Sequence, residues 1–378
     1  MKSWEVFVLQ VQQIKIYPLS LTLKSPFKTA HGTTLQRPIT LVAITLTNGV
    51  TGYGEIQSFI DDQYVPETHM QSLQMVQRMA RQLISLDFDT PQMVSNWLTN
   101  SSHLSFAKSA VEMAFWDAYG KQVKQPLWSM IGGQEKQIAV SSVIGIQDSW
   151  QQTQAVANNL IGQGYQRIKI KIDQQTDITS IKKLLAQFPE QMFSLDANAS
   201  WSIDDIARLK TLDRAGLALI EQPFPASAWF EHKSVQQQLD QLQLSLDESL
   251  NGLADVKRAI TEQTTRALTI KQGKLGGINQ AHQAINLATK AKLNPWIGGM
   301  LGSGLGRAVD LALASLPGAN QVPADSAQFD HYFEADIGRD LPYVHQGCLP
   351  LPEHNGIGVA IDWQTVAKYL IHEPIVYQ

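Results

Sequence analysis

Cysteine is almost missing from this sequence: Cys348 is the only one among 378 residues. A single cysteine excludes an internal disulfide and a cysteine cluster around a metal, and no histidine can be matched to it as the partner of a catalytic thiol. We therefore expect Cys348 to be a buried or incidental thiol.

Long apolar runs and clusters of positive charge are missing as well. No stretch is long enough to span a bilayer, and residues 1–12 have no signal-peptide pattern, so we expect a cytoplasmic protein without a membrane partner. The net charge is −4 and the 30 lysines and arginines are scattered, which leaves no basic stripe for nucleic acid. The expected partner is a small molecule, and a homo-oligomer stays open.

The chain length of 378 residues predicts a large domain and a smaller one, because a single core rarely organises so long a chain. Residues 6–17, 39–46 and 50–56 are rich in strand-forming residues, and Asn48-Gly49 between the last two runs predicts a hairpin. Apolar residues recur at helical spacing over 66–98 and 104–121. We expect an α+β capping domain over residues 1–133.

After residue 133 short apolar runs alternate with amphipathic stretches, which is typical of repeated βα units and a parallel sheet. From Lys171 the strand ends follow at intervals of 25, 25, 26 and 24 residues. No Gly-rich phosphate turn is present, so a closed barrel is favoured over an open sheet. We expect a TIM-like (β/α)7β barrel over residues 134–325, and a segment 326–378 that completes the barrel and returns to the cap. The predicted strands are 139–143, 167–171, 192–196, 217–221, 243–247, 267–271 and 295–299.

Five consecutive predicted strands end in a charged residue, at the barrel end where active sites form. Asp196, Glu221 and Asp247 end three adjacent strands, and three converging carboxylates repel unless a cation neutralises them. Oxygen ligands favour Mg²⁺, with Mn²⁺ as the alternative, over zinc.

Lysines end the strands on either side of these carboxylates. Lys169 and Lys171 are two apart on one strand, so both point into the barrel. Two neighbouring ammonium groups lower each other's pKa, which makes a lysine usable as a base. Lys271 lies four strands further on, across an eight-stranded barrel. This set predicts removal of a proton next to a metal-bound carboxylate.

The motifs resemble the enolase superfamily, in its muconate-lactonising-enzyme-like branch, and within it the o-succinylbenzoate synthases and the related N-acylamino acid racemases. The resemblance runs nearly end to end. Its motifs are Lys169-x-Lys171, Asp196-Ala-Asn198, Glu221-Gln-Pro, Asp247-Glu248-Ser, Lys271-x-Gly-Lys-x-Gly-Gly277, Pro26-Phe27-Lys28-Thr29, Gly52-Tyr53-Gly54-Glu55, Tyr64-Val65-Pro66-Glu67-Thr68 and Gly298-Gly299-Met300-Leu301.

The resemblance implies roles for single residues. Lys171 would remove the proton and help hydroxide leave, Lys169 would assist, and Lys271 would act as a cation over the ring or as a second base. Asp196, Glu221 and Asp247 would bind the metal, with Glu248 and Lys274 supporting them. The residues implied to contact the substrate are Phe27, Thr29, Asn198, Gly299 and Met300. The N-terminus of the helix that opens at residues 302–304 could receive a distal carboxylate, or the two glycines could form a tight loop that binds no ligand.

The implied reaction is Mg²⁺-dependent dehydration of 2-succinyl-6-hydroxy-2,4-cyclohexadiene-1-carboxylate to o-succinylbenzoate in menaquinone synthesis, with racemisation of N-succinylamino acids as the alternative. Three positions depart from the pattern: Gly302 replaces a usual glutamate, Val143 a frequent serine, and Lys274 the arginine of racemase-competent relatives. The last departure favours the synthase. Two other functions are less favoured. A Schiff-base enzyme would use a lysine but would leave the three carboxylates without a role. A non-catalytic scaffold protein would be expected to have lost at least one of the charged residues.

Overall fold

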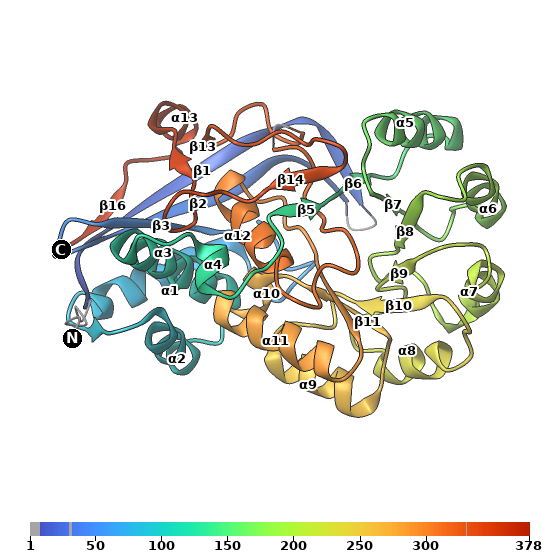
Figure 1. Ribbon diagram of the computed structural model, residues 1–378, viewed down its shortest axis with the longest axis horizontal. Helices are drawn as coiled ribbons and strands as arrows, with labels where there is room; N and C mark the ends of the chain where they lie inside the picture. Colours follow the sequence, from blue (N-terminus) through green and yellow to red (C-terminus); the bar gives the residue numbers. More distant parts are fainter. Residues whose placement is uncertain (1–7, 30–31, 330) are drawn as a thin grey trace.

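The computed structural model describes residues 8–29, 32–329 and 331–378 (Figure 1). It consists of an N-terminal capping domain built on an antiparallel sheet and a parallel sheet surrounded by helices. No helix in the described part of the chain is long and apolar enough to cross a membrane.

The capping sheet contains the predicted hairpin. Its strands are ordered β16-β1-β2-β3, and β4 also pairs with β1. Thr45 pairs with Thr51 across the Asn48-Gly49 turn, and Gly49 has the positive φ of 83° that this turn requires. The strands are β1 (Leu9–Thr29), β2 (Gly32–Leu46), β3 (Thr51–Ile56), β4 (Asp87–Phe88) and β16 (Ile375–Tyr377).

Three helices cover this sheet: α1 (His69–Leu83), α2 (Pro91–Ser101) and α3 (Ser105–Val123). The predicted helical region 66–98 is thus two helices, because Asp87–Phe88 leaves the helix to pair with β1. Helix α3 packs directly against β3. A Cβ atom on Gly52 would lie 2.0 Å from the carbonyl oxygen of Ala114, so only glycine permits this approach.

Seven parallel strands form the second sheet, in the sequential order β6 to β12. The bounds of β7 and β8 are those predicted, and the others differ by a few residues at their ends. The strands are β6 (Ser141–Ile144), β7 (Arg167–Lys171), β8 (Met192–Asp196), β9 (Leu219–Glu221), β10 (Gln243–Leu246), β11 (Ala267–Ile270) and β12 (Asn294–Ile297).

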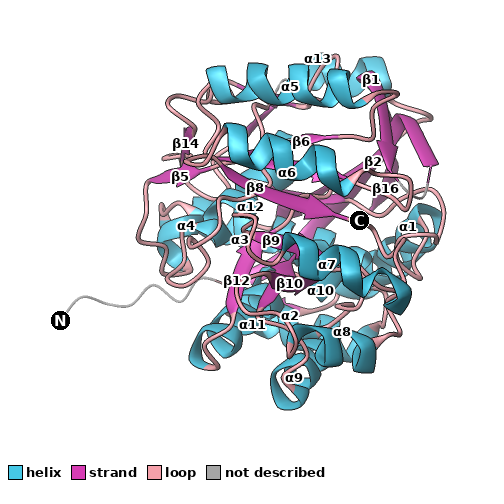
Figure 2. Cartoon of the chain, turned by 90° about the vertical axis from the view of Figure 1, so that its right-hand side faces the viewer, coloured by secondary structure: helices cyan, strands magenta, loops and turns pink. Residues whose placement is uncertain are grey.

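Helices that alternate with these strands lie on the outside of the curled sheet (Figure 2). Their apolar faces pack on the outward-pointing strand residues, such as Ile168 and Ile170 of β7. Arg167, Lys169 and Lys171, the alternate residues of β7, point inward. The helices are α5 (Trp150–Gly162), α6 (Ile178–Gln187), α7 (Ile206–Leu212), α8 (Trp229–Gln236), α9 (Leu253–Glu262), α11 (Ile278–Lys290) and α12 (Gly304–Ala314).

A very short stretch takes the place of an eighth strand. Ala324 forms a parallel bridge with Val140 beside β6, and the backbone N–H of Asp325 donates to Ile297 of β12 at 2.9 Å. The two edges of the sheet are linked in this way, which confirms the predicted barrel behind an α+β cap. Residues 324–325 precede the boundary expected at 326, and the domain boundaries stay predictions.

The remaining elements are short. They are α4 (Leu127–Met130), β5 (Gln137–Ala139), a 3₁₀ turn (Ile203–Asp205), α10 (Gln272–Leu275), β13 (Gly338–Arg339), β14 (Cys348–Pro350), β15 (Ala360–Ile361) and α13 (Trp363–Tyr369).

Candidate active site

The predicted charged residues gather at the C-terminal ends of the parallel strands. Lys171, Asp196 and Glu221 end β7, β8 and β9. Asp247 and Lys271 directly follow β10 and β11. The register pairs Lys171 with Asp196, and Asp196 with Glu221, so the structure brings these side chains together at one end of the sheet.

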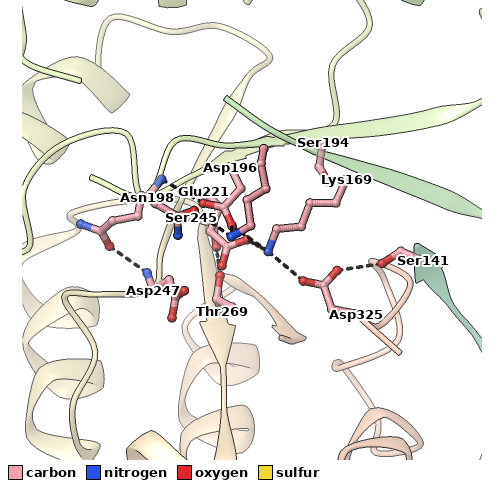
Figure 3. Close-up of polar contacts among 12 residues, drawn as sticks. Ser141, Lys169, Ser194, Asp196, Asn198, Glu221, Ser245, Asp247, Thr269 and Asp325 are labelled. Carbon is pink, nitrogen blue, oxygen red and sulfur yellow. Dashed lines mark hydrogen bonds and ion pairs between the residues drawn. The ribbon is translucent and has the colours of Figure 1, made fainter. Parts of the chain in front are cut away.

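Lys169 lies one pleat deeper and is surrounded by acidic groups (Figure 3). Its Nζ lies 2.5 Å from Glu221 Oε2, 3.0 Å from Asp196 Oδ2 and 2.8 Å from Asp325 Oδ2. Burial lowers the pKa of Lys169, but the carboxylates of Asp196, Asp325 and Glu221 outweigh it and hold the pKa well above its usual value. The expected lowering of the pKa by a neighbouring ammonium is therefore wrong for Lys169.

Glu221 is the least neutralised carboxylate of the site. Both of its Oε atoms are buried and accept no hydrogen bond, although Lys169 Nζ lies 2.5 Å from one of them. Burial, followed by the nearby Asp196 carboxylate, raises the pKa of Glu221 to about 8. Carboxylate oxygens that accept no hydrogen bond are suitable ligands for a hard divalent cation.

The carboxylates do not yet surround a common metal position. Among the described residues no three acidic, histidine or cysteine side chains converge on one point as they stand. The ammonium groups of Lys169 and Lys271 lie between neighbouring carboxylates, with Lys271 Nζ 2.7 Å from Asp247 Oδ2 and 3.9 Å from Glu221 Oε1. The oxygen donors fit a divalent metal, and its binding requires these two ammonium groups to move off the carboxylates.

Asp247 is held by groups from both domains. The Tyr64 hydroxyl, from the cap, lies 2.7 Å from both carboxylate oxygens and accepts a 2.7 Å hydrogen bond from Lys271 Nζ. Lys274 Nζ lies 3.0 Å from Asp247 Oδ1 and also donates to the Asp247 carbonyl. Burial opposes ionisation of Asp247, but Lys271 and Lys274 hold its pKa well below the usual value. Lys274 thus contacts Asp247, and its supporting role stays a prediction.

Asn198 links Lys171, at the end of β7, to Glu248, which follows β10. Lys171 Nζ donates to Asp196 Oδ2 at 2.7 Å and to Asn198 Oδ1 at 2.8 Å. The Asn198 amide nitrogen in turn donates to Glu248 Oε1 at 3.0 Å. Asn198 has a positive φ of 43°, a costly conformation that turns its amide toward the site. Glu248 therefore orients Asn198, and its supporting role stays a prediction.

A cavity of about 230 Å³ opens above these residues between the cap and the barrel. Three carboxylates, Asp196, Glu221 and Asp247, lie beneath it, fully buried and absent from its walls. The side chain of Thr29, also expected to contact the substrate, lies outside the described part of the structure. The other predicted residues in the walls are Phe27, Lys169, Lys171, Asn198, Lys271, Gly299 and Met300.

The N-terminus of α12 differs from the expectation of a carboxylate-binding site for the substrate. Both oxygens of Asp336 lie 2.9 Å from the N–H of Gly304, and Glu55 accepts the N–H of Ser303 at 3.1 Å. The protein's own carboxylates occupy the donors that a ligand would need. The helix terminus is therefore not a substrate site.

From the sequence alone, no role was assigned to three residues of the site. Asp325 contacts Lys169 from a strand too short to leave an apolar run. Tyr64 was noted only as part of a motif, and Arg307, which lines the cavity, stands in an ordinary helical pattern. Asp325 lies 26 residues beyond residue 299, the predicted end of the seventh strand, and this spacing was the one signal that could have indicated it.

Comparison with known proteins gives a consistent set of relatives. Residues 12–132 match the mandelate racemase / muconate lactonizing enzyme N-terminal domain, and residues 152–365 match the enolase C-terminal domain-like family. The chain is 33% identical to an o-succinylbenzoate synthase of Geobacillus stearothermophilus over 96% of both chains. It is 32% identical to an N-succinylamino acid racemase of Thermus thermophilus, over 95% of this chain and 97% of the relative.

Among solved structures, a member of the enolase superfamily from Listeria innocua superposes with a TM-score of 0.93 at 30% identity. The superposition covers 97% of this chain and 98% of that one. The resemblance to o-succinylbenzoate synthases and N-succinylamino acid racemases expected from the motifs is confirmed by these comparisons.

Proposed function

The chain belongs to the enolase superfamily, and from this premise we propose that it is an o-succinylbenzoate synthase, a carbon–oxygen lyase. The reaction is dehydration of 2-succinyl-6-hydroxy-2,4-cyclohexadiene-1-carboxylate to o-succinylbenzoate, a step of menaquinone synthesis carried out in the cytoplasm. The observation that carries the proposal is that Lys171 and Lys271 line opposite walls of one cavity, and that three buried carboxylates lie beneath it.

Enzymes of this superfamily generally use a divalent metal, and we assign Mg²⁺, with Mn²⁺ as the alternative. Asp196, Glu221 and Asp247 would hold it, and it would stabilise the negative charge that develops on the substrate carboxylate. The two buried Oε atoms of Glu221, which accept no hydrogen bond, support this assignment. Lys274, and Glu248 through Asn198, keep the ligand strands in place.

Lys171 is assigned as the acid–base group. Its Nζ takes the proton from the carbon next to the carboxylate, the C–H electrons form the new ring double bond, and the C–OH bond breaks. The same ammonium returns the proton to the departing hydroxide, which leaves as water. Asn198 holds Lys171 at 2.8 Å on the side facing the cavity.

The other two lysines act as cations in this scheme. Lys169, which would keep its ion pair with Asp325 after moving off the metal ligands, places a positive charge beside the substrate carboxylate. Lys271 faces the ring from the opposite wall. Phe27, Thr29, Gly299 and Met300 would complete the substrate pocket and exclude water.

The test is a spectrophotometric assay of the Mg²⁺-loaded protein on the cyclohexadiene substrate. Lys171→Ala should lower kcat by about 10² to 10⁴, since a positioned acid–base group contributes that much. Lys182→Ala, at an exposed lysine of α6, is the matched control and should retain activity. Wild-type turnover by Lys171→Ala would contradict the assignment.

The second candidate is racemisation of N-succinylamino acids. Lys271 on the opposite wall favours it, because two bases on opposite faces can exchange the α-proton of either enantiomer, and one relative is such a racemase. Exchange of deuterium from solvent into both enantiomers would establish this activity, and its absence would remove the candidate.

A further inference from the structure

Four cationic side chains of the described residues line the cavity, and one differs from the others. Lys169, Lys171 and Lys271 each lie within 3.0 Å of a carboxylate oxygen. No ion pair joins Arg307 to a carboxylate of the described residues, and Asp336 and Asp310 attract its charge only from a longer distance. A buried cation that lines a cavity and has no carboxylate of the described residues within ion-pair distance can bind an anion there.

Arg307 is held rigidly in this position. It is 4% exposed, its Nη1 donates to the Phe329 carbonyl at 3.0 Å, and its Nη2 donates to the carbonyls of Gln328, at 3.0 Å, and Ala327. These acceptors are neutral carbonyls that orient the guanidinium, and no described residue accepts a hydrogen bond from Nε. The group is therefore fixed before any ligand arrives.

Arg307 lies next to an aromatic part of the cavity wall. Its Cζ lies 5.8 Å from the ring centroid of Tyr332, which in turn lies 6.0 Å from the ring of Phe27 in the cap. Both rings belong to the wall of the cavity. At the N-terminus of the same helix Asp336 accepts the N–H of Gly304, so this backbone donor is already occupied.

We propose that Arg307 binds the second carboxylate of a dicarboxylate substrate and so selects succinyl compounds over their uncharged analogues. The proposal rests on the proposed function, in which the first carboxylate lies at the metal site. Charge-assisted hydrogen bonds are about twice as strong as neutral ones, so their loss is expected to reduce affinity about 10- to 100-fold.

The experiment compares two ligands by isothermal titration in the presence of Mg²⁺. One is o-succinylbenzoate, and the other is 2-butanoylbenzoate, in which a methyl group replaces the distal carboxylate. The wild type should bind the dicarboxylate at least about tenfold more tightly, whereas Arg307→Met should bind both about equally. Arg307→Gln keeps N–H donors for the carbonyls of residues 327–329 and should show the same loss if Arg307→Met fails to fold. Arg258→Met, at a half-exposed arginine of α9, is the matched control.

Binding and turnover separate this inference from the proposed function. A wild type that prefers the dicarboxylate through Arg307, but neither dehydrates nor racemises, would overturn the proposed function and keep the inference. Equal wild-type affinity for the two ligands, or an unchanged preference in both folded Arg307 variants, would overturn the inference alone. Failure of the wild type to bind either ligand would overturn both.

Discussion

Replacing Tyr64 by phenylalanine tests whether the cap takes part in the chemistry of the barrel. The substitution removes only the hydroxyl, which donates to Asp247 and accepts from Lys271, each at 2.7 Å. Hydrogen bonds to charged groups contribute about 1.5–3 kcal/mol each, and water entering the gap would replace part of that. We therefore expect a net loss of about 2 kcal/mol, which corresponds to roughly a 30-fold lower kcat.

The assay for Tyr64→Phe has two parts. Initial rates of dehydration give kcat and KM. Deuterium exchange into each enantiomer of an N-succinylamino acid reports separately on Lys171 and on Lys271, which face opposite sides of the substrate. Because Tyr64 contacts Lys271 and not Lys171, exchange at the face served by Lys271 should fall most. The reasoning is refuted if kcat changes less than about threefold or if both faces lose exchange equally. Tyr343→Phe, at a tyrosine that is 73% exposed, is the control.

Three further predictions concern stability and metal binding. Gly302→Ala should lower the free energy of unfolding in urea by about 1–3 kcal/mol, because the new Cβ would lie 2.4 Å from the buried Gln57 Nε2. Gly162→Ala is the control, since a Cβ there meets open space and should not destabilise the protein. Equal urea midpoints for the two variants would contradict this reasoning. Burial lowers the pKa of His69 to about 4, whereas the unfolded chain takes up this proton below about pH 6.5. As the pH falls from about 6.5 to about 4, the free energy of unfolding should therefore decrease by up to about 3 kcal/mol. If His69→Gln shows the same dependence of stability on pH, His69 is not the cause. Glu221→Gln should weaken Mn²⁺ binding at least about tenfold in a titration followed by electron spin resonance, and unchanged affinity would remove Glu221 from the ligand set.

Much of the barrel could be predicted from the sequence because its strands are buried on both faces. Such strands appear as short apolar runs, and the charge that ends each run marks where the chain reaches the active site. The bounds of β7 and β8, and the gathering of Lys171, Asp196 and Glu221, follow from this regularity. The regularity ends where the eighth strand shrinks to residues 324–325, and Asp325 was missed for that reason.

Contacts that join distant segments could not be predicted in the same way. No local pattern indicates that Asp336 closes the N-terminus of α12, since 32 residues separate it from Gly304. The raised pKa of Lys169 likewise depends on carboxylates from three other strands or segments. Spacing within one strand places two lysines side by side, but the charge around them is set by the whole barrel.

The pairing of β16 with β1 has a consequence for how the chain reaches its final form. Ile14 pairs with Tyr377, so the first and last described strands are neighbours in one sheet although almost the whole chain separates them. Until the last segment has been synthesised, the edge of β1 has unpaired backbone N–H and carbonyl groups, which are a template for intermolecular strand pairing. The cap, which is made first, can thus be completed only last, and during synthesis this edge is where we expect the growing chain to be most prone to aggregation.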